Sequence, residues 1–477
     1  MYKKKTMNFD IDDLICSIST PPGVGAIAIV RISGNDSLML LEKVFNPFNV
    51  ISIPELQPKK AYYGQILDND TLIDEVLVTY FKAPHSYTGD DIIEIACHGS
   101  QFIQRQILQL LIDKGCRTAK PGEFTMRAFI NGKMDLTQAE AVGDLIHSRN
   151  SWSHKAALTQ MKGSFSKRLM VLSDKLLHLI SLVELELDFS EEDVEFADRG
   201  MLKTLLTETQ TEVQQLYNSY SAGQVIKSGI PVAIVGQPNA GKSTLLNKIL
   251  QEERAIVSEI AGTTRDTIED TIVLDSIEFR FIDTAGLRKT GDTIEKMGIE
   301  RSLDKVNRAW IVLFLFDSTS NIADVKHAFE LVLTSSDTNQ HIVAVANKVD
   351  LLKTDQRDSK IQEIADSIGI APSDMVYISA KHEKNIPELV TKLVEHAKEM
   401  LPDEDSLIVY NTRQYELLMK ILVALGDTLT ALENQLTGDL LAFELRKVLT
   451  FMGELTGTVI SPDMVLGNIF KNFCVGK

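Results

Sequence analysis

The stretch Gly236-Gln-Pro-Asn-Ala-Gly-Lys-Ser243 decides the fold of the middle of this chain. It is a complete G-x-x-x-x-G-K-[ST] pattern, preceded by the apolar run 230–235 and followed by the helix-forming run 244–250. A strand, a glycine-rich loop and a helix in this order bind phosphate, because the loop N–H groups and the helix N-terminus point at the anion. We expect Lys242 to reach the β- and γ-phosphates of a nucleotide and Ser243 to hold Mg²⁺.

Three further motifs follow apolar, strand-like runs. They are Asp283-Thr-Ala-Gly286, Asn347-Lys-Val-Asp350 and Ser379-Ala-Lys381. The Asp350 carboxylate can accept hydrogen bonds from N1–H and the exocyclic amine of guanine, a donor pair that adenine lacks. Asp283 can orient Mg²⁺ through water, and the Gly286 amide can approach the γ-phosphate. Motifs in this order, each at a strand end, predict a GTP hydrolase built on a doubly wound sheet.

The predicted GTP contacts come from the phosphate loop, from the switch I segment and from the three later motifs. They are Asn239, Ala240, Gly241, Lys242, Ser243, Thr244, Ser258, Glu259, Ile260, Ala261, Gly262, Thr263, Thr264, Asp283, Thr284, Ala285, Gly286, Asn347, Lys348, Asp350, Ser379, Ala380 and Lys381.

The hydrolytic step lacks one common part. Small GTPases often carry a water-orienting Gln directly after D-T-A-G, but Leu287 stands there in this chain. Another group must therefore orient the attacking water, and Glu295 and Asp292 are the candidates. Thr264 in switch I is the expected second Mg²⁺ ligand beside Ser243, because the γ-phosphate orders this loop.

The charge that develops in the transition state also needs a partner. A monovalent cation held by the Asn239 side chain and by switch I carbonyl groups can supply it. An arginine finger from Arg265 or Arg288 is the alternative, and the residues alone leave both possibilities open.

Length and composition indicate a globular protein of about three domains. The chain has 477 residues, of which 44% are hydrophobic and 24% are charged. Its cysteines are scattered without metal-site spacing, which predicts a reduced, cytoplasmic protein; they are Cys16, Cys97, Cys116 and Cys474. We expect no membrane span and no signal peptide. The net charge of −17 argues against a surface that binds nucleic acid throughout, but it leaves room for a local basic patch.

The pattern along the chain predicts a multidomain protein with three kinds of structure. Residues 1–128 mix short strands and helices, as in an α+β domain, and residues 129–228 are helical. Residues 229–400 form the inserted α/β GTPase domain, and residues 401–477 return to helical spacing as the second part of the helical domain. The acidic stretch 188–198 is interpreted as a solvated connection between helices.

The motifs together resemble the tRNA-modification GTPase family MnmE, also called TrmE. The central and C-terminal matches are Gly236–Ser243, Gly262-Thr-Thr-Arg-Asp266, Asp283-Thr-Ala-Gly-Leu-Arg288 and the tail Cys474-Val-Gly-Lys477. The N-terminal matches are Pro21-Pro-Gly23, Arg31-Ile-Ser-Gly34, Thr88-Gly-Asp-Asp91, His98-Gly99, Pro121-Gly-Glu-Phe124 and Asn131-Gly-Lys-Met-Asp-Leu136. The resemblance covers essentially the whole chain.

The resemblance implies a folate-binding, dimerising N-terminal domain and a flavin-dependent partner, MnmG (GidA), which carries FAD and joins in a heterotetramer. Together the two proteins would build an aminomethyl-type group, carboxymethylaminomethyl, on C5 of the wobble uridine of certain tRNAs. The carbon would come from 5-formyl- or methylene-tetrahydrofolate. The folate contacts map to Arg31, Glu94, Lys133 and Lys477. Without the family, an Arg31–Glu94 surface ion pair is the simpler interpretation.

The resemblance also implies potassium-activated hydrolysis through pairing of two nucleotide domains. The potassium ligands map to Asn239, Ser258, Ile260 and Thr263, and the water-bridging acid maps to Glu295. Cys474 matches the tail cysteine of the family, where a nucleophile and a packed thiol are both possible.

Two other classes of protein compete with this interpretation. A ribosome-assembly GTPase of the Era/Der type would need a KH-like RNA-binding module or a second GTPase domain, and neither pattern is visible. A membrane-remodelling GTPase would need a basic amphipathic or transmembrane segment.

Overall fold

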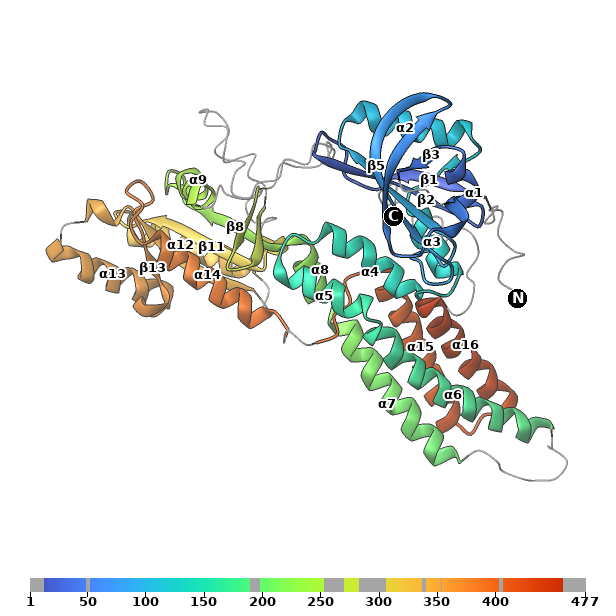
Figure 1. Ribbon diagram of the computed structural model, residues 1–477. Coiled ribbons are helices and arrows are strands. Elements are labelled where there is room, and N and C mark those ends of the chain that lie inside the picture. The colour runs from blue at the N-terminus through green and yellow to red at the C-terminus, as the bar shows by residue number, and fades with distance from the viewer. Residues whose placement is uncertain are drawn as a thin grey trace. The chain divides into compact units, whose positions relative to one another are not determined.

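The computed structural model describes residues 13–48, 52–188, 198–252, 270–282, 306–336, 340–352, 354–402 and 406–457. The chain separates into two compact units (Figure 1). One contains residues 1–147, 157–214 and 416–477, and the other contains residues 148–156 and 215–415. Each is described by itself.

The first unit begins with a seven-stranded sheet of order β3-β4-β5-β6-β2-β1-β7. Among the described strands of this sheet, only β1 and β7 pair in parallel. The strands are β1 (Ile15–Ile18), β2 (Ile27–Ser33), β3 (Phe45–Pro47), β4 (Ala61–Asp68), β5 (Thr71–Phe81), β6 (Ile92–His98) and β7 (Arg117–Thr118). Alternate residues such as Val30, Val78 and Ile95 pack with helices α1 (Ser37–Glu42) and α2 (Gln101–Asp113) in one core. This is the α+β region that the sequence predicts.

The other described elements of the first unit are helices. α3 (Glu123–Ile130) and α4 (Leu136–His147) precede α6 (Ser164–Asp188), and α16 (Gly438–Thr456) packs against both α6 and α4. α5 (Ser151–Met161), α7 (Arg199–Asn218) and α15 (Thr412–Glu433) run from one unit into the other. Helices on either side of the nucleotide-binding segment therefore share one unit, while the predicted domain boundaries stay a prediction.

The second unit contains a six-stranded sheet of order β13-β12-β11-β8-β10-β9, in which only β9 runs antiparallel to its neighbour. The strands are β8 (Ile230–Gly236), β9 (Asp270–Leu274), β10 (Ile277–Phe281), β11 (Ile311–Asp317), β12 (His341–Asn347) and β13 (Val376–Tyr377). The first six residues of β8 and of β11 are buried, as expected for strands covered on both faces.

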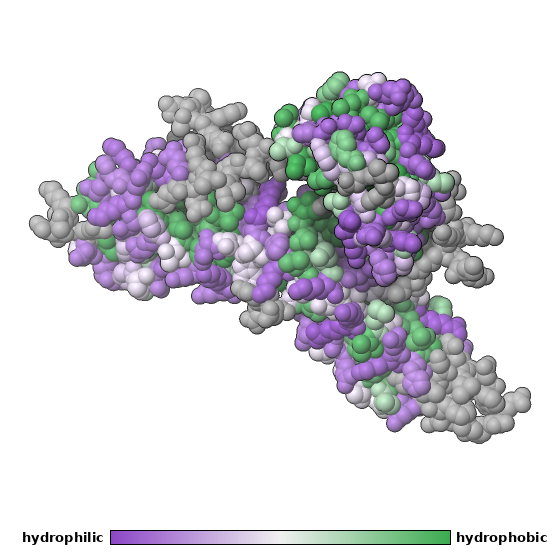
Figure 2. All heavy atoms as spheres, in the orientation of Figure 1, coloured by the Kyte–Doolittle hydropathy of each residue, from purple (hydrophilic) through white to green (hydrophobic). Residues whose placement is uncertain are grey.

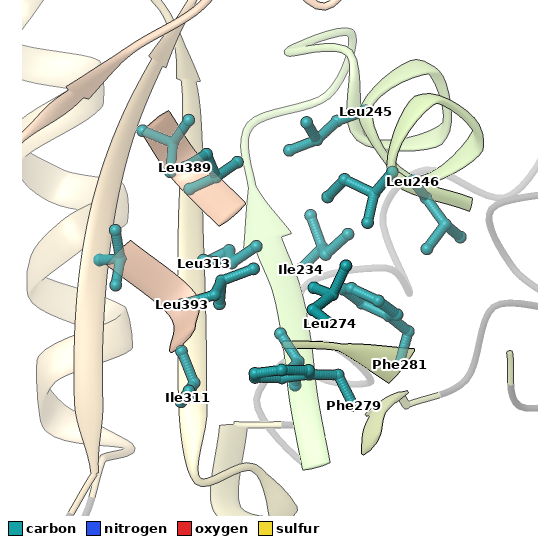
Figure 3. Packing of buried hydrophobic residues seen from close by; sticks show 14 of the residues in the cluster. Ile234, Leu245, Leu246, Leu274, Phe279, Phe281, Ile311, Leu313, Leu389 and Leu393 are labelled. Atoms are coloured by element: carbon teal, nitrogen blue, oxygen red, sulfur yellow. The ribbon is translucent and has the colours of Figure 1, made fainter. Parts of the chain in front are cut away.

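Helices cover both faces of this sheet. α9 (Lys242–Glu252) and α14 (Ile386–Met400) pack on one face, and α12 (Ile322–Thr334) and α13 (Thr354–Ile368) pack on the other. Figure 3 shows Leu245 and Leu389 directed toward the strands that carry Ile234 and Leu313. The sheet is doubly wound, as the sequence predicts. α8 (Tyr220–Ser228) leads into β8, and the short helices η1 (Ile53–Glu55), η3 (Val349–Leu351) and η4 (Pro372–Asp374) complete the described elements.

Among the described residues, no helix combines the length and the apolar character that a membrane crossing requires. Figure 2 shows hydrophilic residues over much of the visible face of each unit, and smaller apolar areas lie among these hydrophilic residues.

Candidate nucleotide site

Two glycines let the phosphate loop turn between β8 and α9. A Cβ atom on Gly236, whose φ is +139°, would lie 1.8 Å from the Leu315 carbonyl oxygen of β11. A Cβ atom on Gly241, whose φ is +97°, would lie 2.4 Å from Asn347 Nδ2. The first contact is with main chain, so a side chain at Gly236 would push β8 and β11 apart. Glycine is required at both positions by close approach and by backbone conformation.

The remaining loop residues gather around the start of α9. Lys242 Nζ donates to the carbonyl oxygens of Gly236 at 2.9 Å and of Gln237 at 2.8 Å, so the ammonium group lies across the loop. Asn239 has a φ of +59°, a left-handed conformation that asparagine tolerates. Ser243 and Thr244 stand in the first turn of α9. The Lys242 ammonium group therefore lies against the loop that leads into α9, and Ser243 stands in the first turn of that helix, an arrangement that fits a phosphate with Mg²⁺.

Asn347 joins the phosphate loop to the base-recognition loop. It ends β12 and is 3% exposed. Its Nδ2 donates to the Ala240 carbonyl oxygen at 2.7 Å, and its Oδ1 accepts from the Ala380 N–H at 3.0 Å. The two ends of one amide thus hold two loops that are distant in sequence. Asn347 therefore holds the phosphate loop and the base-recognition loop together, a role that the motif alone did not reveal.

Asp350 lies in η3, one turn beyond Asn347. The Ser379 hydroxyl is the main cause that lowers the pKa of Asp350, and the charges of His382 and Lys381 lower it further. Asp350 is therefore ionised at neutral pH and presents acceptors only, as recognition of a guanine donor pair requires.

Sequence reasoning missed Asp317, the last residue of β11. Its Oδ2 lies 2.8 Å from Lys348 Nζ. Burial raises the pKa of Asp317, but the Lys348 ammonium and the Thr319 hydroxyl and N–H together bring it below its usual value. The ion pair fixes Lys348, which itself has a φ of +62°. A charged residue directly after the apolar run 311–316 is the sequence signal that could have identified Asp317.

Other predicted site residues lie outside the described part of the chain. They are Ser258, Glu259, Ile260, Ala261, Gly262, Thr263, Thr264, Arg265, Asp283, Thr284, Ala285, Gly286, Arg288, Asp292, Glu295, Cys474 and Lys477. Their predicted roles therefore stay predictions.

The predicted folate residues lie in the first unit. Arg31 of β2 and Glu94 of β6 are register partners, and Glu94 Oε1 accepts from Arg31 Nε at 3.0 Å and from Nη2 at 2.7 Å. The Arg31 guanidinium also lies 5.8 Å from the Tyr87 ring centre and 5.6 Å from the Phe124 ring centre. The ion pair that the sequence offered as the simpler interpretation is present, with two aromatic rings beside it.

Lys133 lies near the segment 83–91, which carries Tyr87. Its Nζ donates to the Pro84 carbonyl oxygen at 2.8 Å, in the segment that also carries Tyr87. A Cβ atom on Gly89 would lie 3.4 Å from Lys133 Cγ. The segment 83–91 thus contacts Arg31 through Tyr87 and contacts Lys133 through Pro84.

The fold and the site of the second unit define a class. A doubly wound sheet carries a phosphate loop after β8, and Asn347, Asp350 and Ser379 stand at the ends of the neighbouring strands β12 and β13. This arrangement is that of a P-loop nucleotide-binding protein with the base-recognition motifs of a GTPase.

Comparison with known proteins names the family. The profile described as MnmE helical domain matches residues 136–474, and the profile described as GTP-binding protein TrmE N-terminus matches residues 14–133. A relative from Bacteroides fragilis, named tRNA modification GTPase MnmE, is 47% identical over 466 residues, which is 98% of this chain and 99% of the relative. One of the same name from Christiangramia forsetii is 45% identical and covers 98% of this chain and 100% of its own. The chain belongs to the MnmE (TrmE) family of tRNA modification GTPases.

A solved structure of Era with MgGDPNP and nucleotides of 16S ribosomal RNA aligns with a TM-score of 0.28 and 26% identity. It covers 41% of this chain and 66% of its own. Membership of the MnmE family replaces the ribosome-assembly alternative. By this membership the protein is a GTP hydrolase that acts in tRNA modification.

Proposed function

We propose that this chain, with a flavin-dependent partner of the MnmG (GidA) type that carries FAD, adds a carboxymethylaminomethyl group to C5 of the wobble uridine of certain tRNAs. The one-carbon unit comes from 5-formyl- or methylene-tetrahydrofolate. The observation that carries the proposal is the 47% identity over nearly the whole of both chains, which includes the N-terminal and the nucleotide-binding parts. We further propose a homodimer within a heterotetramer, action in the cytoplasm, and the domain boundaries 1–128, 129–228, 229–400 and 401–477.

The chemistry around Arg31 supports a folate role for the N-terminal unit. Folate offers a carboxylate tail and a flat pterin ring with a donor edge. The Arg31 cation suits the carboxylate, the Glu94 carboxylate suits the donor edge, and the Tyr87 ring suits the flat face. We assign Lys133 and Lys477 to the same ligand as further cations. When folate binds, Arg31 and Glu94 would then either separate or bind the ligand while they remain hydrogen-bonded to each other.

The predicted catalytic groups belong to the nucleotide site. We propose that Asn239, with Ser258, Ile260 and Thr263, holds K⁺ against the phosphates, and that Ser243 and Thr264 hold Mg²⁺. Arg265 and Glu295 are the proposed charge-neutralising and water-positioning residues. Only Asn239 and Ser243 lie among the described residues, and the left-handed Asn239 is part of the phosphate loop itself.

Hydrolysis should therefore depend on the monovalent cation. We expect faster GTP hydrolysis in KCl than in NaCl at equal ionic strength, because Na⁺ is smaller and suits a different cavity size. Asn239→Ala should remove most of the difference. Phosphate release, measured at matched protein concentrations, checks this. Equal rates in both salts would remove Asn239 from the catalytic set.

Modified-nucleoside analysis tests the proposed function. Deleting the gene should remove the C5 substituent from the wobble uridine of the affected tRNAs, and the wild-type chain should restore it. Mass spectrometry of nucleosides from purified tRNA provides the measurement. An unchanged wobble uridine in the deletion strain would refute the proposal, even if the protein hydrolyses GTP.

A further inference from the structure

A second cluster of chemistry-bearing side chains lies at the other end of β12 from the nucleotide site. His341 begins this strand and Asn347 ends it, so the two positions are about 20 Å apart along the strand. His396 and Glu399 lie near the C-terminal end of α14, which packs on the same sheet. None of these three residues belongs to a nucleotide motif.

The geometry brings the three side chains together. One ligand atom from each of His341, His396 and Glu399 lies within 4.8 Å of the others. The two imidazole rings have centroids 4.8 Å apart and an interplanar angle of 35°. His396 Nδ1 lies 3.3 Å from Glu399 Oε2. Because His396 and Glu399 are three residues apart on one helix, they face the same side.

The surroundings favour a cation at this position. The C-terminal end of α14 carries the negative end of the helix dipole beside His396 and Glu399. Lys398, the nearest positive charge in sequence, forms an ion pair with Asp275, with 2.5 Å between Nζ and Oδ2. The His396 side chain is 23% exposed and the Glu399 side chain 63% exposed, so an ion can reach the cluster from solvent.

We propose that His341, His396 and Glu399 bind a divalent transition-metal cation of the Zn²⁺ type. Two imidazoles and one carboxylate suit Zn²⁺, whereas Mg²⁺ and Ca²⁺ prefer oxygen ligands only. Three protein ligands leave one position of a tetrahedral ion for water. A small side-chain adjustment suffices, because the ligand atoms already lie within 4.8 Å of one another. The ion would link the start of β12 to the end of α14.

Zn²⁺ titration of the nucleotide-free, chelator-treated full chain tests the proposal, with excess Mg²⁺ present to occupy sites for hard cations. We expect calorimetry to detect one Zn²⁺ site, and its affinity should fall by at least about tenfold in His341→Ala and in His396→Ala. Even the loss of a residue that only orients a metal ligand typically lowers metal affinity by that much. Glu399→Gln should weaken it too. His327→Ala changes an exposed histidine of α12 and should leave the affinity unchanged.

Co²⁺ provides a second measurement, because its visible absorption is stronger when the ion has few ligands, as in this site, than when water surrounds it. The band expected in the wild type should be absent from His396→Ala. Unchanged GTP binding by each variant shows that the nucleotide unit is folded. Zn²⁺ affinity that is the same in the wild type and in a His341→Ala/His396→Ala double variant would overturn the proposal.

Discussion

Replacing Asp350 by Asn should weaken GTP binding by about 3–4 kcal/mol, roughly 100- to 1,000-fold, because two hydrogen bonds to a charged acceptor are lost or inverted. An amide offers one acceptor and one donor where the carboxylate offers acceptors only. Its N–H₂ group would face the exocyclic amine of guanine, donor against donor. Xanthine carries a carbonyl oxygen at that position. The variant should therefore gain affinity for XTP as it loses affinity for GTP.

Fluorescence titration with labelled GTP and XTP gives both affinities in one experiment. Glu383→Gln is the matched control, because Glu383 follows Ser379 and Lys381 in the loop after β13, where it forms an ion pair with Lys248. The control should bind GTP as the wild type does. If Asp350→Asn retained full GTP affinity, Asp350 would not be the residue that recognises the base.

Replacing Arg127 by Met should destabilise the N-terminal unit by about 3–5 kcal/mol, the usual cost of breaking a buried charge network from one side. Arg127 is 1% exposed and its Nη2 donates to Glu123 Oε1 at 3.1 Å and to Asp13 Oδ1. Arg117 binds the same two acids, with its Nη2 at 2.6 Å from Glu123 Oε1 and its Nε at 2.7 Å from Asp13 Oδ2. Removing Arg127 leaves the buried Glu123 carboxylate and the partly buried Asp13 carboxylate with one cation.

Acid should weaken the same network. Burial raises the pKa of Glu123, but bonds from Arg117 and from the Lys120 N–H lower it more, and the net pKa lies below its ordinary value of 4.5. The pKa of Asp13 is likewise lowered, since Arg117 and Arg127 outweigh burial. A carboxylate whose pKa is lower in the folded state than in the unfolded state stabilises the fold. This stabilisation is complete at pH values above the unfolded-state pKa, and it is lost as the pH falls through the folded-state pKa. The gap between the wild type and Arg127→Met should therefore shrink below about pH 4.

Hydrogen exchange of the full-length protein, read by mass spectrometry on peptides from β1 and α3, measures this local stability. Arg168→Met is the control, because the exposed Arg168–Glu212 pair should contribute at most about 1 kcal/mol. GTP binding should be unchanged, since the nucleotide site belongs to the other unit. A loss in Arg127→Met no larger than in the control would show that the buried network is not stabilising.

Local patterns predicted the nucleotide unit well. The run 230–235, the phosphate loop and the helix-forming run 244–250 are neighbours in sequence, and β8, the turn and α9 follow them closely. The run 341–346 became β12 for the same reason. The run 375–378 became only the two-residue β13, because only Val376 and Tyr377 pair with β12. The apolar pattern of a run indicates which residues are buried, whereas the length of the strand depends on how many of them form hydrogen bonds with the neighbouring strand.

Contacts between distant residues could not be predicted in the same way. Asn347 and Ala380 are 33 positions apart, and Arg127 and Asp13 are 114 positions apart. Buried arginines are rare, so nothing in the helix pattern of 123–130 marks Arg127 as fully enclosed. Arg31 and Glu94 were selected by the family resemblance, and their register pairing across β2 and β6 depends on the order of strands in the sheet.

We expect the loops at the ends of β8, β12 and β13 to form one site that selects guanine. Isothermal titration calorimetry of the wild-type chain with non-hydrolysable GTP and ATP analogues, in Mg²⁺, measures this selectivity. The guanine analogue should bind at least about 1,000-fold more tightly, because the adenine analogue leaves the Asp350 acceptors without donors. Equal affinities for the two analogues would contradict it.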